Sequence, residues 1–510
     1  MEMNYAKTVE KWGTLEVAVK GPKEGNPFCD QWIKGTFECK NEKKTVDGFY
    51  DGDGVYKVRF MPSFVDTYTF KIESSFQTES AEEVSGSFEA VAPSADNHGP
   101  VRVAGTYYLA YEDGKPYHCI GTTCYVWNLQ NEKLQEQTLK TLEENAFNKI
   151  RFCIFPKHYD YNLHEPITYP YEGTPCDTSE LNENNFAEYN GCAPGNDWDF
   201  TRFNPAHFQH IEECIKKLMA LGIQADLIVM HPYDRWGFSM MKAEDDDRYW
   251  KYVLARFSAY RNVWWSLANE YDLMHEKTLA DWERYAAIIC EKDPYHHLRS
   301  IHNCKAYYDY NQPWVTHCSI QRTETYRSSE LVNEWREKYH KPVVLDEICY
   351  EGNIQFGWGN ISGEEMTRRF WEAFCRGGYP GHGETYLSPD RILWWSHGGV
   401  LHGTSPERIK FLAKIMEETP GLGVEPMPCK WDEVACRAAG FPARKDYFIY
   451  YYTFMRPSFR DFYFDDTTEY QVEIIDTWEM TITDGGIHKG QFRVQLPGKE
   501  YIAVRIKAVK

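Results

Sequence analysis

The sequence predicts an α/β protein in which a (β/α)8 TIM barrel lies between an N-terminal Ig-like β-sandwich and a C-terminal β-sandwich. Three observations lead to this architecture. Apolar strand-like runs alternate with amphipathic helical runs over residues 99–423, and eight such repeats favour a closed parallel barrel. Segments 1–98 and 424–510 instead alternate with period two, as strands do. A chain of 510 residues fits two or three domains of this kind.

The two flanking segments are expected to contain only β-structure. Asp-Gly dipeptides occur between the alternating runs of both segments, and Asn-Pro also occurs in the first. Segment 92–100, rich in Pro, Ser, Asn and Gly, is the expected linker to the barrel. The strongest alternating runs are 13–19, 36–39, 55–60, 67–72, 447–452, 470–482, 491–494 and 501–506.

The central segment carries eight expected strands. Amphipathic stretches at 132–145, 205–221 and 279–291 lie between them and predict helices. The insertion 160–199 follows the second strand and is expected to be a functional loop on the catalytic face. The strands are 118–122, 149–154, 224–230, 263–268, 298–302, 315–320, 343–347 and an eighth near 381–386 or 392–395.

Composition excludes some classes of partner and favours others. The formal net charge of −20 argues against nucleic acid, and a small neutral carbohydrate fits better. Aromatic residues make up 16% of the chain, which suits stacking on sugar rings, although aromatic-rich cores would give the same value. No apolar run approaches the roughly 18 residues that span a membrane. The sequence leaves homo-oligomer formation open.

The N-terminal residues and the cysteines bear on location and metal binding. The first residues lack the apolar stretch of a secretory signal, and the 15 cysteines form no Cys-x-x-Cys pair. Reduced buried thiols and a cytoplasmic location are therefore expected. The cysteine spacing does not predict a metal site, and the sequence has no His-Glu-x-x-His pattern. No cofactor is expected.

Two glutamates stand at the ends of predicted strands. Glu270 follows the apolar run 263–268, and Glu347 ends the run 343–347. A carboxylate after a buried strand is costly unless it has a role, and side chains at the carboxyl ends of barrel strands point into the active site. A rim salt bridge is the alternative for either glutamate alone. Together they predict the acid pair of glycoside hydrolysis.

Neighbouring residues suggest different roles for the two acids. Arg151 is a charge inside an apolar strand and would keep a nearby glutamate ionised, so Glu347 is assigned as nucleophile and Glu270 as acid/base. Asn269 precedes Glu270 and could hold a sugar hydroxyl. Further candidates for binding sugar hydroxyls are His158, Tyr159, His231, Asp234, His302 and Asn303. Trp127, Trp395 and His382 could form the floor under the sugar ring. Glu351 and Glu384 could replace one of the two acids.

Several motifs together resemble a known family. The clan A retaining glycoside hydrolases have motifs that resemble Ala268-Asn269-Glu270 and Asp346-Glu347. Within that clan, the barrel resembles an uncharacterised branch, numbered 4038, through segments 121–127 and 377–383. This branch is a relative of the family 5 glycosidases and includes apiose-releasing enzymes. The first domain resembles the 5060-type sandwich through 26–28, 48–52 and 58–60. The last domain resembles the 5605-type module through 475–481 and 496–498.

This resemblance implies a retaining glycosidase with Glu270 as acid/base and Glu347 as nucleophile. It further implies that Asn269 holds the substrate and that Arg151 corresponds to the arginine of the clan on strand two. The sequence departs from the clan at strand six, where a His and a Tyr are usual. Here His317 lies too early and Gln321 takes the place, which leaves the hydrogen-bond partner of Glu347 open.

The expected function is therefore a retaining O-glycoside hydrolase that acts on the ends of small plant-derived glycosides or oligosaccharides. The insertion 160–199 would wall its pocket. Three alternatives remain: a non-catalytic carbohydrate-binding protein on the same barrel, a transglycosylase with the same residues, and a metal-dependent barrel hydrolase. The flanking sandwiches are expected to pack on the barrel or on a sister subunit rather than to bind glycan.

Overall fold

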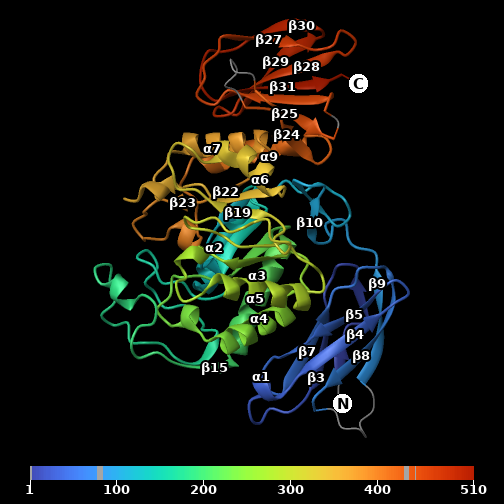
Figure 1. Cartoon of the computed structure of the whole chain (residues 1–510), viewed down its shortest axis with the longest axis vertical. Coiled ribbons are helices and arrows are strands. Elements are labelled where there is room, and N and C mark those ends of the chain that lie inside the picture. The colour runs from blue at the N-terminus through green and yellow to red at the C-terminus, as the bar shows by residue number, and fades with distance from the viewer. Residues whose placement is uncertain (1–2, 77–83, 430–435, 443, 510) are drawn as a thin grey trace.

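Eight parallel strands form the centre of the molecule and make a nearly closed barrel (Figure 1). The computed structural model describes residues 3–76, 84–429, 436–442 and 444–509. Along the barrel the strand order is β18-β17-β16-β13-β12-β22-β20-β19. A parallel bridge between His302 and Ser319 brings the two ends of this order together. The strands are β12 (Gly121–Thr123), β13 (Lys149–Cys153), β16 (Gln224–Met230), β17 (Val263–Ala268), β18 (Arg299–Ser300), β19 (Cys318–Gln321), β20 (Val343–Glu347) and β22 (Tyr379–His382).

The predicted barrel is confirmed, and most of its strands lie where the sequence places them. The bounds of β16, β17 and β20 match the prediction to the residue. The eighth strand, β22, begins two residues before the first predicted placement. The second placement, 392–395, is wrong, because Trp394–His397 form the short helix α8. Hairpin strands β10 (Val101–Ala104) and β11 (Tyr108–Tyr111) precede the barrel.

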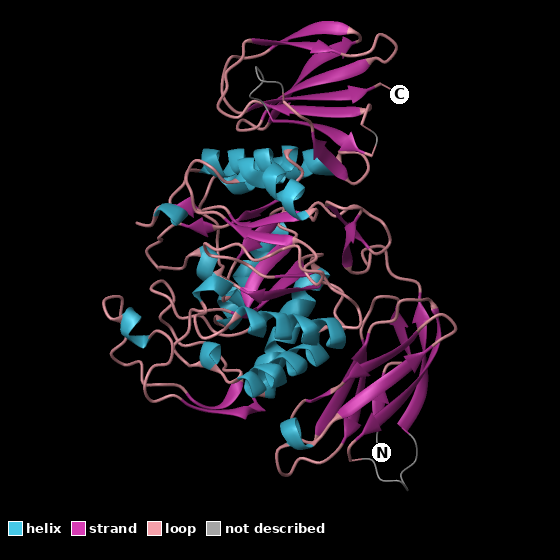
Figure 2. Cartoon of the chain, viewed as in Figure 1, coloured by secondary structure: helices cyan, strands magenta, loops and turns pink. Residues whose placement is uncertain are grey.

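Helices surround the barrel strands and bury their apolar faces against them (Figure 2). Local signals fix where several of them begin. The Asn131 side chain accepts the Leu134 amide at the start of α2, and Thr278 and Asp281 form a capping box at the start of α5. The helices are α2 (Glu132–Glu144), α3 (Pro205–Ala220), α4 (Ala243–Phe257), α5 (Leu279–Lys292), α6 (Val332–Tyr339), α7 (Gly363–Cys375) and α9 (Ser405–Glu417).

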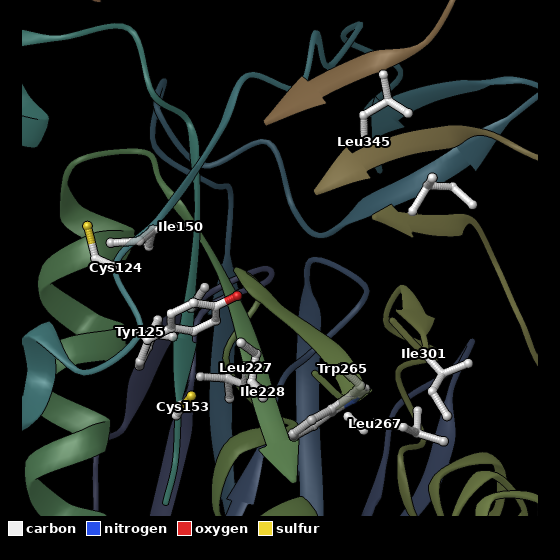
Figure 3. Close-up of a cluster of buried hydrophobic side chains, with 14 of the residues drawn as sticks. Cys124, Tyr125, Ile150, Cys153, Leu227, Ile228, Trp265, Leu267, Ile301 and Leu345 are labelled. Atoms are coloured by element: carbon white, nitrogen blue, oxygen red, sulfur yellow. The ribbon is translucent and has the colours of Figure 1, made fainter. Parts of the chain in front are cut away.

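Apolar side chains on the outer faces of the barrel strands pack against the surrounding helices. Figure 3 shows Ile150, Leu227, Leu267 and Leu345, which come from four different strands, in one buried cluster. The insertion after the second strand forms a hairpin of β14 (Tyr171–Thr174) and β15 (Asp197–Phe203) with a 3-10 turn between them.

The N-terminal region is a sandwich of two sheets with an apolar core between them. One sheet has the order β1-β3-β7-β6 and the other β2-β9-β8-β4-β5. A short helix, α1 (Pro27–Asp30), lies between β3 and β4. The strands are β1 (Met3–Tyr5), β2 (Thr8–Glu10), β3 (Leu15–Lys20), β4 (Ile33–Glu38), β5 (Lys43–Asp47), β6 (Phe49–Tyr50), β7 (Val55–Phe60), β8 (Asp66–Ser74) and β9 (Val84–Val91).

The C-terminal region is also sheet-rich and lies over α7 and α9 in Figure 1. A six-stranded sheet with the order β24-β25-β26-β31-β28-β29 is accompanied by the pair β27-β30. The rings of Trp371 on α7 and Tyr451 on β26 pack with centroids 5.7 Å apart. The strands are β24 (Gly423–Pro426), β25 (Cys436–Phe441), β26 (Tyr447–Tyr451), β27 (Phe459–Tyr463), β28 (Tyr470–Asp476), β29 (Thr481–His488), β30 (Gln491–Gln495) and β31 (Ile502–Ala508).

A buried ion-pair network joins the N-terminal sandwich to the barrel helices. Arg59 on β7 makes a two-pronged contact with Glu212 on α3, at 2.6 and 2.9 Å, and donates to the Arg256 carbonyl oxygen at 2.7 Å. Arg256 in turn pairs with Glu212 and with Asp51 of the sandwich. Charges buried this deeply are stable only while all of them are paired.

We expect Arg59→Ala to destabilise the protein by about 3 kcal/mol, because it removes one of the two arginines that hold buried Glu212. Differential scanning calorimetry measures the loss as a lower first transition. The control Lys34→Ala breaks the solvent-exposed pair with Glu73 and should cost less than about 1 kcal/mol. Equal effects of the two changes would contradict this account of the interface.

Candidate active site

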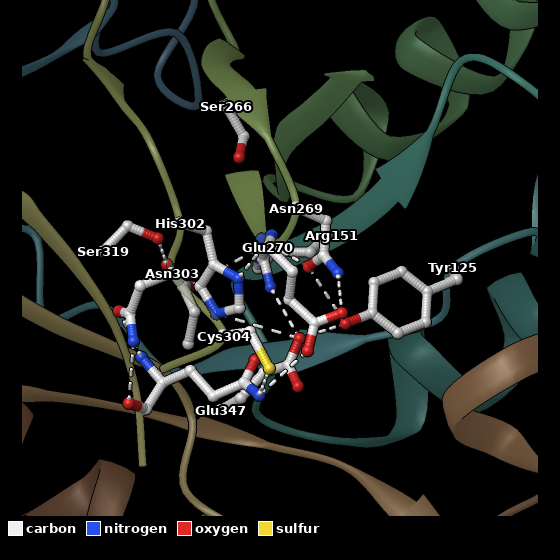
Figure 4. Close-up of polar contacts among 12 residues, drawn as sticks. Tyr125, Arg151, Ser266, Asn269, Glu270, His302, Asn303, Cys304, Ser319 and Glu347 are labelled. Carbon is white, nitrogen blue, oxygen red and sulfur yellow. Dashed lines mark hydrogen bonds and ion pairs between the residues drawn. The ribbon is translucent and has the colours of Figure 1, made fainter. Parts of the chain in front are cut away.

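Two glutamates lie together at the carboxyl end of the barrel (Figure 4). Glu347 is the last residue of β20, and Glu270 lies two residues beyond β17. Glu270 has a φ of 52°, in the left-handed region that residues other than glycine rarely adopt. Such a conformation costs on the order of 1 kcal/mol and persists only where the surroundings fix it. Here it sets the direction of the Glu270 side chain.

Glu347 is held by a tyrosine and an arginine. The Tyr125 hydroxyl donates to Glu347 Oε1, and Arg151 Nη1 lies 3.4 Å from the same oxygen. Both donors favour the ionised carboxylate. His302 Nε2 lies 3.8 Å from this oxygen, but burial lowers the pKa of His302 well below its usual range, so the ring faces Glu347 without charge.

Glu270 has a separate set of donors. Gln321 Nε2 donates to Glu270 Oε1 at 2.9 Å, and the Tyr233 hydroxyl donates to Oε2. Asn269 Nδ2 also donates to Oε2, at 3.2 Å. Gln321, proposed from the sequence as a replacement partner for Glu347, therefore holds Glu270, and the partner of Glu347 is Tyr125.

Asn269 connects the two acids. Its amide nitrogen reaches Glu270, while its oxygen accepts from Arg151 Nη2 at 3.2 Å and lies 3.1 Å from the Tyr125 hydroxyl that holds Glu347. One side chain thus spans the donors of both carboxylates. A change at Asn269 would disturb the two acids together.

The two carboxyl groups share their electrostatic surroundings. Burial, and next the charge of Glu270, raise the pKa of Glu347 to about 7, while Arg151 and the Tyr125 hydrogen bond act in the opposite direction. Arg151 alone does not keep Glu347 fully ionised, in contrast to the sequence-based expectation. Glu347 is therefore only partly ionised at neutral pH.

Both glutamates face one cavity of about 260 Å³. Its wall is largely aromatic, and Trp395 stands against Tyr125, Tyr159 and Trp358 with ring centroids 5.2 to 5.6 Å apart. A larger surface groove of about 660 Å³ runs along α2 but does not contain either glutamate. The cavity is lined by Tyr125, Lys157, Tyr159, Tyr233, Glu270, Cys304, Lys305, Gln321, Thr323, Glu347, Cys349, Tyr350, Trp358 and Trp395.

The sequence-proposed residues fall into three groups. Glu270, Glu347, Gln321, Tyr159 and Trp395 line the cavity. Asn269, Arg151 and His302 lie behind it and contact the two acids. The remaining candidates for sugar contacts lie outside the cavity lining: Trp127, His158, His231, His382, Asp234 and Asn303.

Burial explains why these residues do not face the cavity. Trp127 packs against Phe152 in the core. His158 binds the Phe186 carbonyl oxygen and Arg235, and so anchors the insertion. Burial lowers the pKa of His158 to about 4.

Two further histidines are fixed by their surroundings in the same way. His231 lies 3.4 Å from the Phe155 carbonyl oxygen, and His382 stacks on Phe147. Burial lowers the pKa of each ring to about 3. Neither ring is therefore placed or charged to hold a sugar in the cavity.

The insertion 160–199 contributes less to the wall than the sequence suggests. Only Tyr159, directly before it, lines the cavity. Asn26 of the sandwich binds Thr201, in the strand that closes the insertion. The N-terminal domain therefore meets the strand that closes the insertion.

One buried cluster has spacing suited to a metal ion. In the described part of the chain, ligand atoms of Glu351, His382 and Glu384 lie within 4.8 Å of one another. The carboxylates are already occupied, however: Glu384 accepts the His402 and Gly403 amides, and Glu351 accepts those of Thr404 and Ser405. These acids hold the loop before α9 and are not the catalytic pair.

Sequence reasoning missed several residues of the cavity. Tyr125 belongs to a motif noted for its likeness to a family, but nothing in its spacing indicates contact with Glu347. Lys157 and Tyr233 lie in loops after the second and third strands, where periodicity gives no information. The position of these loops at the carboxyl ends of strands was the available signal.

The fold and the paired acids in an aromatic cavity define the chain as a glycoside hydrolase. A family model described as the apiosidase-like catalytic domain matches residues 104–420. Models of two domains of unknown function, DUF5060 and DUF5605, match residues 8–75 and 431–507. The chain belongs to the apiosidase-like family, and the resemblance expected from the sequence is confirmed.

Solved structures agree with this assignment. The crystal structure of a "putative glycoside hydrolase" from Bacteroides vulgatus is 38% identical, with a TM-score of 0.90 over 99% of this chain and 100% of that chain. A glycoside hydrolase family 5 protein from the same organism is 16% identical, with a TM-score of 0.59 over 80% of this chain and 94% of that one. The second likeness shows the fold alone. No curated protein matches the chain.

In the part of the chain that the structure describes, no helix combines the length and the apolar character of a membrane span.

We expect Glu347→Gln to stabilise the fold by about 1–3 kcal/mol at pH 8 and by much less at pH 5. The folded-state pKa of Glu347 lies above its ordinary value, so the stability due to the buried neutral carboxyl is present below pH 4.5 and is lost as pH rises through about 7. Gln keeps the shape without the charge. Thermal unfolding at both pH values measures the difference.

The exposed change Glu213→Gln serves as the control, because Glu213 makes only a surface pair with Lys216. It should give the same small effect at both pH values. A Glu347→Gln variant that is less stable than the native protein at pH 8 would show that the ionised carboxylate is well accommodated.

Proposed function

We propose that this protein is a retaining O-glycosidase that releases one terminal sugar from small plant-derived glycosides. The observation that carries the proposal is the pair Glu270 and Glu347, which face one aromatic cavity and are connected through Asn269. Two carboxyl groups acting on one acetal carbon are the requirement of glycoside hydrolysis. The family match to apiosidase-like domains supports the reaction class.

The surroundings of the two acids support different roles. Glu347 is contacted by Arg151 and by the Tyr125 hydroxyl, donors that stabilise negative charge on a nucleophile. Glu270 receives hydrogen bonds from neutral groups only, Gln321, Tyr233 and Asn269. In the proposed reaction Glu347 attacks the anomeric carbon while Glu270 protonates the leaving oxygen.

The second step reverses the role of Glu270. Once the sugar is bonded to Glu347 and the leaving group has departed, Glu270 carries a negative charge and accepts a proton from water, which attacks the same carbon. The first step needs Glu270 protonated and Glu347 ionised at its start. Burial raises the pKa of Glu347 to about 7, so this acid becomes available as a carboxylate from about neutral pH upwards.

The size of the cavity supports action on a chain end. Its volume of about 260 Å³ lies below the roughly 300–1,000 Å³ of sites that take drug-sized ligands. A single sugar ring fits such a space better than several consecutive residues of a polymer. The rings of Trp395 and Trp358 supply flat faces for it.

The direct test is to remove each acid from the protein and supply azide. Glu347→Ala should lower kcat on aryl glycosides at least a thousandfold, because the nucleophile is lost, and azide should restore turnover with inverted product. Glu270→Ala should keep activity on substrates with good leaving groups and give azide products of retained configuration. Proton NMR of the product reads the configuration.

The panel of substrates should include aryl glycosides of hexoses, pentoses with apiose, and uronic acids. Full turnover by Glu347→Ala would refute the proposed nucleophile. Sugar binding detected by calorimetry without turnover of any substrate by the native protein would favour a carbohydrate-binding role instead.

The pH profile gives a second test. Since Glu347 must be ionised to attack and its pKa is raised to about 7, kcat/KM should fall as pH decreases through about 7. Tyr125→Phe removes a hydrogen bond that lowers this pKa, so the acid limb should move to higher pH. An acid limb near pH 4 in the native protein would contradict the assignment.

A further inference from the structure

Lys157 is a buried cation in the active-site cavity, and the proposed reaction does not use it. It is 2% exposed and lines the cavity beside Glu270 and Glu347. Among the residues that the structure describes, no carboxylate oxygen lies within 4.0 Å of its Nζ. A buried ammonium without an anionic partner is costly. Its presence in a substrate cavity therefore needs an explanation.

Aromatic rings surround the ammonium group. Nζ lies 3.5 Å from the ring centroid of Tyr125, 4.2 Å from that of Tyr233 and 4.7 Å from that of Trp395. Ring faces attract a cation, but they accept none of its three hydrogen bonds in the way an oxygen does. The cage fixes the ammonium beside the cavity and leaves it able to donate to a ligand.

The same rings fix the ammonium relative to the reaction centre. The Tyr125 hydroxyl donates to Glu347 and the Tyr233 hydroxyl donates to Glu270. Lys157 therefore lies between the two tyrosines that hold the catalytic acids. A group bound by Lys157 would belong to the sugar whose bond is broken or to its immediate neighbour.

The charges that line the cavity favour a negatively charged ligand. Two lysines, Lys157 and Lys305, line the cavity with the two glutamates. Burial raises the pKa of Glu347 to about 7, so the negative charge of that acid is only partly present at neutral pH. Arg151 adds no free charge, because Asp226 and Asp346 lie 3.6 and 3.8 Å from its Nε. Burial lowers the pKa of Lys157 to about 8, so the ammonium remains mostly charged at neutral pH.

We propose that Lys157 binds the carboxylate of an acidic sugar, so that the substrate of this site is a glycoside containing a uronic acid. The inference rests on the proposed function for the location of the site and adds the class of substrate. A carboxylate supplies acceptors for the ammonium and balances its charge. A neutral sugar would offer only hydroxyl groups to the same cation.

Binding of matched sugars tests the inference without requiring turnover. Isothermal titration compares sodium D-glucuronate with D-glucose and sodium D-galacturonate with D-galactose, pairs that differ only in the carboxylate. We expect at least one acid to bind ten times or more tightly than its neutral counterpart. Equal or weaker binding of both acids, or no measurable binding of any of the four, would overturn the inference.

Variants then assign the preference to Lys157. Lys157→Met has similar length and an apolar side chain suited to the aromatic cage, and it should abolish the preference for the acid. Lys216→Met, which removes a surface lysine on α3 paired with Glu213, should retain it. Circular dichroism checks the fold, and Lys157→Gln replaces the Met variant if that variant unfolds. A preference that survives the loss of the ammonium would overturn the assignment.

Hydrolysis assays separate this inference from the proposed function. Turnover of aryl hexosides with no preference for aryl uronides would refute the role of Lys157 and leave the glycosidase intact. Lys157-dependent binding of uronates with no hydrolysis of any aryl glycoside would support the acidic-sugar site and refute the proposed reaction.

Discussion

The Arg151 guanidinium connects the charged residues inside the barrel to the glutamates of the active site. Below it, Lys149 binds Asp226 and Asp346, each at 2.7 Å. The Arg151 Nε faces these two aspartates, while its two terminal nitrogens reach Asn269 and Glu347. The barrel therefore contains a column of alternating charges that ends at the active site.

This column limits what the barrel core can contain. Burial alone would raise the pKa of Asp346, but Lys149 and Arg151 hold it well below its usual range, so the charges persist inside the barrel. Replacing one member would leave another without its partner, at a cost of several kcal/mol. Fixed in this way, Arg151 cannot turn to neutralise Glu347 completely, and the pKa of that acid stays raised. Glu347 is therefore only partly ionised near neutral pH.

The sequence predicted what depends on strand periodicity. The apolar runs 263–268 and 343–347 gave the strands that carry the two glutamates, and the order of acids at strand ends predicted that they would meet. Residues in loops were not predictable in the same way. Tyr125 and Lys157 reach the cavity from loops, whose backbone path has no period. Trp127 packs against Phe152 in the core, whereas Trp395 lines the cavity. Tertiary packing, rather than residue type, decided between these two tryptophans.

The two flanking domains contact the barrel away from the cavity. The sandwich meets α3 and α4 through Arg59, Glu212 and Arg256, and the C-terminal sheet packs on α7. None of the residues that line the cavity comes from either domain. Because α3 and α4 flank β16, which carries Asp226 of the charged column, restraining these helices also restrains the strand on which Arg151 depends. The sandwich therefore supports, through α3 and α4, the strand that carries Asp226 of the charged column.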